Sequence, residues 1–362
     1  MIYPILIAAI IISYFIVYGS ISDQKKAKKF FIVTAFLLIF LVCVLRKHTV
    51  GSDTPAYWRV YLETYDVSFW NFSYVYFEKA FTLLMKLCVL LDFPFELFLA
   101  VCYLIMLLPI AIFVYNFSND PLVSVIIFIC YMFFEFYMTG IRQAMAMSIC
   151  LIGLTIFLCG KKFKYFWYYL FAIIAFFFHK GAIVALFLPL TVFSKKPIYF
   201  LIAMSILFLF MLIFRSSIMA LIKDLSDKDT FNTGASEYFG LNLISLMVIT
   251  AIFTLFYHIK NYNIVDNYAA VKECKKNEYV FINMMVIGVI LMAFFGLERS
   301  ARSSMFYLIA IMCVVPNFLE SFNMKSAFII KFGVIAFLVG YFLVNINTNN
   351  RFALLPYLFF WQ

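Results

Sequence analysis

The feature that most constrains this chain is a series of apolar runs, each about as long as a bilayer is thick. They include Ile2 to Tyr18, Phe30 to Leu45, Phe95 to Phe117, Gly181 to Phe193, Ile198 to Phe214, Leu241 to Ile259, Tyr279 to Leu297 and Ala327 to Val344. A helix needs about 20 mostly apolar residues to cross the hydrocarbon core. The runs therefore predict an all-α, polytopic integral membrane protein with about twelve transmembrane helices.

Composition supports this class of protein. Of the 362 residues, 66% are hydrophobic and 13% are charged, and the mean hydropathy is +1.01. A soluble domain has about 45–50% apolar and about 25% charged residues, so we expect residues 1–362 to form a single transmembrane domain. The first run lacks a basic segment and a cleavage site, which indicates a spanning helix rather than a removed signal.

The positive charge of the chain indicates an orientation in the membrane rather than a nucleic-acid site. The formal net charge is +10, and much of it lies in short loops between apolar runs. Cytoplasmic loops are enriched in Lys and Arg. On this basis we expect four loops to be cytoplasmic: 23–29, 160–164, 195–196 and 260–278. The segments 46–94 and 215–240 are then external loops, and both termini lie outside.

The run from Phe77 to Leu91 has two interpretations. It carries Glu78, Lys79 and Lys86, three charges that suit a lipid-facing span poorly. We interpret it as a re-entrant or interfacial helix on the outside, because the lysine-dense loops downstream then all fall in the cytoplasm. The alternative is a true span, which would invert the orientation of every later helix.

The cysteines and histidines do not follow a metal-binding pattern. The eight cysteines include no Cys-x-x-Cys or Cys/His pair with metal spacing, and the three histidines are far apart in sequence. We therefore expect no metal site and no cofactor.

The turn from Tyr137 to Gln143 joins two apolar runs, Leu122 to Phe136 and Ala144 to Leu158. Each run is about a span long, so Arg142 lies at the tip of a helical pair. An arginine at such a tip either extends to lipid headgroups or lies beside an anion. Gly140 allows a sharp turn or a close approach to a ligand.

Under this topology, polar residues gather on the outer face, mostly at helix ends: Arg46, Asp53, Tyr57, Glu78, Arg142, Gln143, His179, Lys180, Arg299 and Arg302. Arg299 and Arg302 are three residues apart and share a helix face. Guanidinium groups bind phosphate oxygens bidentately. Asp53, Glu78 and His179 are able to accept a proton. The set describes a site for an anionic, lipid-borne substrate.

Each of these residues also has a simpler interpretation. Arg299 pairs locally with Glu298 in that view, and His179 is an ordinary interfacial residue. Asp53 caps a turn, and Tyr57 belongs to an aromatic belt rather than to a surface that stacks on sugars. A site is expected here because several such residues lie together, and their co-location depends on the topology.

Five motifs occur in order along almost the whole chain. They are Arg46 with Gly51-Ser52-Asp53 and Tyr57; Phe77-Glu78; Gly140-Ile141-Arg142-Gln143-Ala144-Met145-Ala146; Phe178-His179-Lys180-Gly181-Ala182; and Leu355-Pro356-Tyr357. In this order they resemble the EpsG family of bacterial polysaccharide polymerases, the Wzy-type enzymes.

The resemblance implies an integral-membrane glycosyltransferase of the GT-C-like class that needs no metal. Such an enzyme joins oligosaccharide repeat units carried on undecaprenyl diphosphate into O-antigen, capsule or exopolysaccharide. The reaction is expected at the outer face of the plasma membrane, which is the periplasmic face in a Gram-negative cell. Expected partners are the lipid-linked donor and acceptor, the bilayer and a chain-length regulator, with no nucleic acid.

The site residues that we expect have two kinds of role. We rank His179 first as the base, Asp53 second and Glu78 third, because a histidine is partly neutral at physiological pH and nearby arginines lower the pKa of a carboxylate. The expected diphosphate- and substrate-binding residues are Arg142, Arg299, Arg302, Gln143, Lys180, Tyr57 and Tyr357, with Arg46 as a weaker candidate.

Two other functions stay open at the level of sequence. A lipid-linked oligosaccharide flippase or another transporter would also be polytopic and basic, but its charges should lie deep within its helices. A membrane acyltransferase that modifies surface glycans would also need a base such as His179.

Overall fold

The computed structural model describes residues 2–73, 77–160, 162–218, 220, 238–263, 277–295, 299–350 and 352–362. This described part is helical and contains no β-strand, although Arg46 and Phe359 form an isolated antiparallel bridge. The chain forms two compact units. Unit 1 comprises Met1–Ile183 and Val315–Gln362, and unit 2 comprises Val184–Val314.

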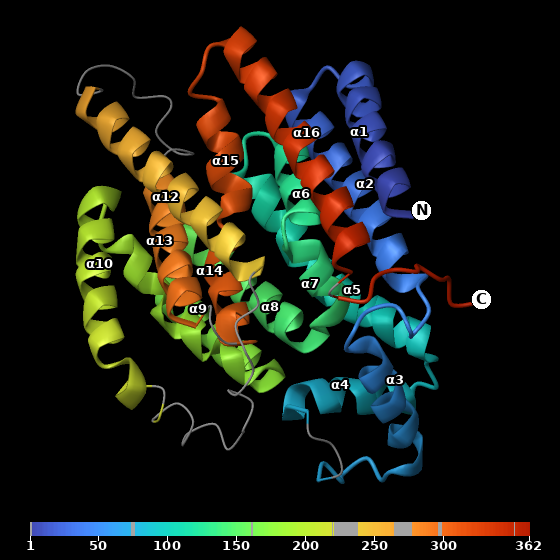
Figure 1. Ribbon diagram of the computed structural model, residues 1–362. Coiled ribbons are helices and arrows are strands. Elements are labelled where there is room, and N and C mark those ends of the chain that lie inside the picture. The colour runs from blue at the N-terminus through green and yellow to red at the C-terminus, as the bar shows by residue number, and fades with distance from the viewer. Residues whose placement is uncertain are drawn as a thin grey trace. The chain divides into compact units, whose positions relative to one another are not determined.

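The helices are labelled in Figure 1. Unit 1 contains α1 (Ile2–Ser20), α2 (Gln24–Val44), α3 (Thr54–Glu63), η1 (Thr64–Asp66), α4 (Lys79–Leu90), α5 (Phe95–Phe117), α6 (Pro121–Cys130), α7 (Phe133–Thr139), α8 (Ile141–Leu158), α9 (Lys164–Phe178) and α16 (Met324–Thr348). Unit 2 contains α10 (Pro197–Ile213), α12 (Tyr238–Asn263), α13 (Glu278–Phe295), η4 (Arg299–Ser304) and α14 (Met305–Leu308). The unit boundaries fall within η2 (Lys180–Val192) and α15 (Ile311–Leu319).

Several described segments are suited to crossing a membrane. Six are long and apolar enough: Ile2–Ser20, Gln24–Val44, Phe95–Phe117, Ile141–Leu158, Arg302–Leu319 and Lys325–Thr348. The bent pair α6–α7 would be a seventh, and five further apolar helices are shorter. These findings support a polytopic, all-helical membrane protein. The total of about twelve spans, the GT-C-like class and the single domain over 1–362 stay predictions.

The bounds of two helices illustrate how local sequence sets them. The helix α5 covers Phe95–Phe117, as predicted. The helix α2 begins at Gln24 rather than at Phe30, so the basic stretch expected as a loop is largely helical. The reason is a cap: the side chain of Asp23 accepts hydrogen bonds from the main-chain nitrogens of Lys25 (2.9 Å) and Lys26 (3.2 Å), which satisfies donors that a helix start leaves unpaired.

The predicted continuous helix from Leu122 to Phe136 is wrong. The helix α6 ends at Cys130, α7 begins at Phe133, and the two axes are bent by 55°. Met132 between them has a φ of 62°, a left-handed conformation that interrupts a right-handed helix.

The segment predicted as a short α-helix over Gly181 to Phe193 also differs. It is the 3₁₀ helix η2, which contains Pro189. Proline has no main-chain N–H group and clashes with the preceding turn of an α-helix, which is consistent with this departure from α-helical geometry.

The polar end of unit 1 is formed by short helices. The helix α4 has 12 residues and is therefore about 18 Å long, less than the roughly 30 Å hydrocarbon core. The re-entrant or interfacial placement of this helix stays a prediction. In Figure 1, α3 and α4 lie beyond the C-terminal end of α2.

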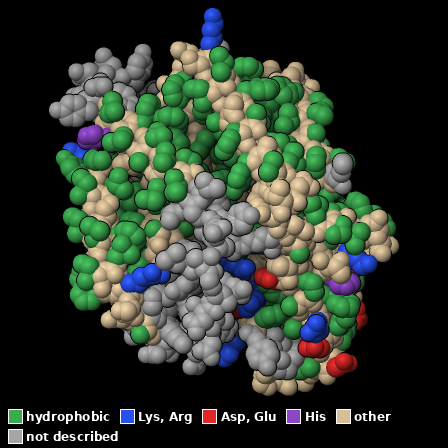
Figure 2. All heavy atoms as spheres, in the orientation of Figure 1, with side chains coloured by type: hydrophobic (Ala, Val, Ile, Leu, Met, Phe, Trp, Pro, Cys, Tyr) green, Lys and Arg blue, Asp and Glu red, His purple; other side chains and the backbone are tan. Residues whose placement is uncertain are grey.

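The long helices of unit 1 divide into central and peripheral ones. The most apolar 18-residue stretch of α8 is 78% buried, whereas that of α16 is 11% buried. Figure 2 shows hydrophobic side chains spread over the long helices, while charged side chains gather over α3 and α4. An apolar outer surface on a span is expected where lipid is the solvent.

Unit 2 has its own polar anchors. The side-chain amide of Asn283 on α13 donates to the carbonyl oxygens of Thr191 (2.8 Å) and Ser194 (2.8 Å). The hydroxyl of Tyr307 on α14 donates to the carbonyl oxygen of Val184 (2.6 Å). These bonds attach η2 and the residue Ser194 that follows it to α13 and α14.

Candidate functional site

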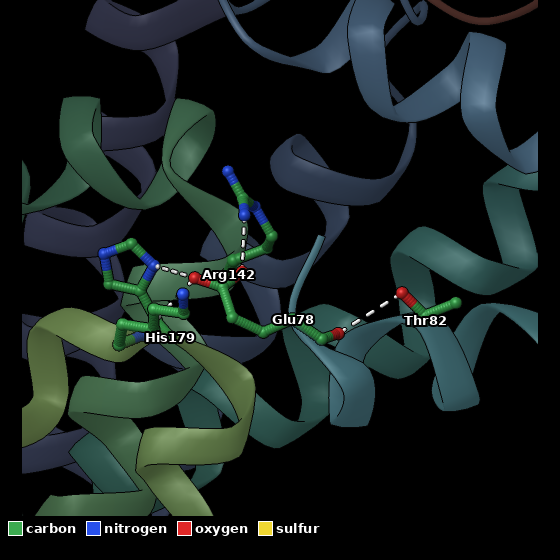
Figure 3. A network of polar contacts seen from close by, with 5 residues as sticks. Glu78, Thr82, Arg142 and His179 are labelled. Carbon is green, nitrogen blue, oxygen red and sulfur yellow. Dashed lines mark hydrogen bonds and ion pairs between the residues drawn. The ribbon is translucent and has the colours of Figure 1, made fainter. Parts of the chain in front are cut away.

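Three residues from distant parts of unit 1 meet at one carboxylate, that of Glu78 (Figure 3). Glu78 directly precedes α4, Arg142 lies in the first turn of α8, and His179 directly follows α9. Arg142 Nη1 lies 2.5 Å from Glu78 Oε2, and His179 Nδ1 lies 3.1 Å from Glu78 Oε1. The main-chain nitrogen of Lys180 donates to the same Oε1 at 3.3 Å. Glu78 therefore joins the two predicted motifs that contain Arg142 and His179.

The turn between α7 and α8 places Arg142. Gly140 is the single residue between the two helices. A Cβ atom at this position would lie 2.8 Å from the ring of Phe136, a distance that no side chain tolerates. The close approach at Gly140 is thus to the protein's own ring, and the expected approach to a ligand stays a prediction.

Glu78 is ionised at neutral pH. Its side chain is 13% exposed, and this burial raises its pKa. The hydrogen bond from His179 and the charge of Arg142 lower it by more, so that the pKa of Glu78 is about 2. A carboxylate with so low a pKa is a weak base.

His179 presents its other ring nitrogen. Because a carboxylate accepts hydrogen bonds and donates none, neutral His179 keeps its proton on Nδ1, facing Glu78. The unprotonated Nε2 is then available as a base. A Cβ atom on Gly181 would lie 3.0 Å from Nε2, so the glycine leaves space beside this atom. The side chain of His179 is 27% exposed.

The guanidinium of Arg142 is held by rings as well as by charge. It lies 4.4 Å from the centre of the Phe77 ring and 5.9 Å from that of Tyr57, distances at which a cation is attracted to an aromatic face. Its Nε is buried without a hydrogen-bond partner in the described part of the chain. Arg142 is therefore oriented, and because its side chain is 23% exposed, an anion could reach its guanidinium.

The model of one protein family matches residues 29–359, nearly the whole chain; that family is EpsG. The chain belongs to the EpsG family. This is a Wzy-type polysaccharide polymerase-like family, so the resemblance seen in the motifs is confirmed. No curated protein and no solved structure matches the chain.

Membership of the EpsG family indicates, in general terms, a role in polysaccharide polymerisation and an activity of the glycosyltransferase type. In this EpsG-family chain the motif residues Glu78, Arg142 and His179 make direct contact. The contact is a property of the fold, since 64 and 101 residues separate Glu78 from its two partners.

The remaining residues predicted in unit 1 are placed as follows. Tyr57 is buried on α3 beneath Arg142, and Gln143 is buried on α8. Asp53 directly precedes α3 without capping it through its side chain, and it accepts a hydrogen bond from Ser52 Oγ at 3.1 Å. Lys180 has an exposed side chain. Their roles in substrate binding and proton transfer stay predictions.

Arg46 lies in a different environment from Arg142. Its side chain is fully buried, its Nη1 donates to the main-chain oxygen of Met138, and its guanidinium lies 5.4 Å from the centre of the Tyr103 ring. A fully buried guanidinium presents no surface to a lipid-borne ligand. Near it, Tyr357 donates its hydroxyl hydrogen to the carbonyl oxygen of Val42 at 2.9 Å.

Arg299 and Arg302 lie in η4 of unit 2. The shared face expected for these two arginines stays a prediction. Glu298, the local partner considered for Arg299, lies outside the described residues. The joint action of Arg299 and Arg302 with Arg142 stays a prediction.

Sequence reasoning missed two features of the site. The first is the direct bond between Glu78 and His179, for which no signal exists in a single sequence. The second is the packing of Phe77 on the guanidinium, which the position of Phe77 next to Glu78 could have suggested. Among the described residues, no group of three or more His, Cys, Asp or Glu side chains is arranged to hold a metal ion.

Proposed function

We propose that this chain is a membrane glycosyltransferase that polymerises undecaprenyl-diphosphate-linked repeat units into a surface polysaccharide. The observation that carries the proposal is the double pairing of Glu78 with Arg142 and His179 in a chain of the EpsG family. This pairing brings together a base, a cation suited to a phosphate group and a carboxylate that orients both.

In the proposed reaction His179 acts on the acceptor sugar. Its Nε2 accepts the proton of the acceptor hydroxyl while the hydroxyl oxygen bonds to the anomeric carbon of the donor chain. The bond between that carbon and the diphosphate oxygen breaks, and the electron pair leaves with undecaprenyl diphosphate. Glu78 holds the proton on Nδ1 and stabilises the imidazolium that forms, as the carboxylate does in catalytic triads.

Arg142 acts on the leaving group. Negative charge develops on the diphosphate as the bond breaks, and a cation fixed nearby stabilises that charge without having to reorganise. We assign this role to Arg142, with Arg299 and Arg302 as further ligands of the diphosphate. Asp53 is the second candidate base, and Gln143, Lys180, Tyr57 and Tyr357 are candidates for binding the sugars.

The proposal includes an orientation. The lysine-rich segments 160–164 and 195–196 favour the cytoplasm under the positive-inside rule, which puts Arg142 and His179 at the outer face. Lipid-linked donor and acceptor units would reach the site from the bilayer, and a chain-length regulator would be a protein partner.

The glycans of a deletion strain test the function. Complementation with wild type should restore long chains, whereas His179→Ala should leave glycans of one repeat unit. The matched control is His258→Ala on α12, which should restore long chains. His258 is exposed and does not belong to the contact formed by Glu78, Arg142 and His179. Loss of all surface glycan with intermediates facing inward would instead indicate a flippase. Full-length chains that lack an acyl group would indicate an acyltransferase.

A further inference from the structure

A second polar site lies at the other end of unit 1. It is a pocket of about 330 Å³ between the ends of α1 and α2 and the connection from α5 to α6, and its lining includes Tyr14, Tyr18, Gln24, Lys25, Lys28 and Asn119. Its volume falls within the roughly 300–1,000 Å³ of small-ligand pockets.

The pocket lies at the level where spans end. The helix α2 has 21 residues and is about 31 Å long, close to the thickness of the hydrocarbon core. Lys25 and Lys28 lie in its first two turns, while Arg46 and the Met138 carbonyl that it binds lie beyond its last turn. The pocket and the contact of Glu78 with Arg142 and His179 are therefore separated by about the thickness of the hydrocarbon core.

The charges of the pocket favour an anion. Asp120 is its one acidic lining residue, and both of its oxygens are engaged. Oδ2 lies 2.5 Å from Lys331 Nζ, and Oδ1 accepts from the main-chain nitrogens of Leu122 and Val123. Glu320, outside the lining, accepts from the amide of Asn119. The charges of Lys25 and Lys28 on α2 thus exceed the acidic charge of the lining.

Lys28 is held in place rather than extended into solvent. Its Nζ donates to the carbonyl oxygen of Ser118 at 2.6 Å and lies 5.5 Å from the centre of the Tyr115 ring. The bond fixes the ammonium group beside the pocket. Tyr14 and Tyr18 bring amphipathic rings to the same level, as is common at membrane interfaces.

We propose that this pocket binds the phosphate headgroup of an anionic phospholipid. Basic pockets between spanning helices can bind the headgroups of anionic lipids. Lys25 and Lys28 would pair with the phosphate, and Gln24 and the tyrosine hydroxyls would bond to the glycerol or headgroup oxygens. The site is independent of the proposed polymerase reaction, because it lies at the opposite end of unit 1.

Lipid binding to the purified full chain tests the site. The probe is phosphatidylglycerol, titrated into detergent-solubilised protein and followed by native mass spectrometry, with phosphatidylcholine and inorganic phosphate as comparison ligands. The pocket variant is Lys25→Gln with Lys28→Gln. The control is Lys26→Gln with Lys29→Gln, which removes the same charge from the same turns at positions outside the lining.

The pocket variant should bind phosphatidylglycerol at least about tenfold more weakly than wild type, because losing one hydrogen bond to a charged group typically costs about tenfold. The control should change binding by less than about threefold. Equal losses in both variants would mean general surface attraction and would overturn the proposal. Equal binding of inorganic phosphate would mean a free-anion site. The single change Lys25→Gln, compared with Lys26→Gln, gives the same test should the loss of Lys28 disturb folding.

Discussion

Two arginines flank the turn between α7 and α8, and they differ in what surrounds them. Arg142 pairs with the carboxylate of Glu78, and its side chain is 23% exposed. Arg46 is fully buried and donates to the main-chain oxygen of Met138, with its Nε and Nη2 unpartnered among the described residues. Both arginines occur in motifs that resemble the EpsG family, yet only the surroundings of Arg142 are open to a ligand.

The difference separates two uses of the same side chain. An arginine paired with a carboxylate at a partly exposed helix end can share its donors with an incoming phosphate. A buried arginine bound to a carbonyl group instead fixes the main chain around it, because breaking the bond would leave a buried polar group unpaired. We therefore expect changes at Arg142 to affect rate and changes around Arg46 to affect stability.

The largest effect is expected at Arg142. Lysine keeps the charge but loses the planar fork, so Arg142→Lys should lower the rate of polymerisation by about 100-fold, the usual cost of losing one donor to a developing negative charge. The measurement is the glycan length distribution at matched protein level. The control is Arg59→Lys, an exposed arginine on α3. Long chains of normal abundance from Arg142→Lys would remove Arg142 from the mechanism.

The next effect concerns the surroundings of Arg46. Gly51 has a φ of 103°, and a Cβ atom there would lie 2.6 Å from Thr54 Oγ1 and 2.9 Å from the oxygen of Met138. Gly51→Ala should therefore destabilise the protein by about 1–3 kcal/mol, seen as a lower melting temperature in detergent. Gly333→Ala on α16 is the control, because its Cβ would meet no atom within 4 Å. Equal melting temperatures for the two variants would contradict this account of the turn.

A smaller effect should appear as a pH dependence of stability. The pKa of Glu78 is lowered from 4.5 to about 2 in the folded protein, so its stabilising contribution is present above pH 4.5 and is lost as the pH falls toward 2. The difference in melting temperature between wild type and Glu78→Gln should shrink over this interval. A change of about 1 kcal/mol corresponds to about 2 °C or less in a chain of this size. A constant difference would mean that Glu78 is not ionised in its pairing.

The smallest effect is expected for a change at Thr82, which contacts the main chain of Glu78 and not its carboxylate. The hydroxyl of Thr82 donates to the main-chain oxygen of Glu78 at 3.3 Å (Figure 3). Thr82→Val keeps the shape and removes this bond, which should cost about 0.5–1.5 kcal/mol of stability. Glycan length should stay normal. A loss of long chains comparable to that of Arg142→Lys would mean that the position of the backbone limits the reaction.

Much of the architecture could be predicted because apolar length is a strong signal. The bounds of α5 agree at both ends, and the shortness of α4 agrees with the three charges in the run from Phe77 to Leu91. The break at Met132 could not be foreseen, since a left-handed methionine has no sequence signature. The 3₁₀ form of η2 depends on tertiary context, although Pro189 in the sequence already disfavours a regular α-helix.

The candidate site could be predicted as a set of residues but not as a set of contacts. Helix ends and the lysine bias were enough to expect Arg142, Glu78 and His179 on one side of the membrane. The bond between Glu78 and His179 depends on how α4, α8 and α9 pack, and that packing is carried by apolar side chains without a distinctive pattern. The burial of Arg46 also depends on tertiary packing. Phe359, which forms an antiparallel bridge with Arg46, lies more than 300 residues away in the sequence.

In the proposed reaction His179, oriented by Glu78, is the base. The measurement that tests it most directly compares His179→Ala with Asp53→Asn at matched expression, in a purified assay with lipid-linked repeat units between pH 6 and 9. We predict that His179→Ala loses about 10²–10⁴-fold in rate, the usual contribution of general-base catalysis, and that Asp53→Asn loses less. Polymerisation by His179→Ala at near wild-type rate across this pH range, with Asp53→Asn inactive, would contradict the account.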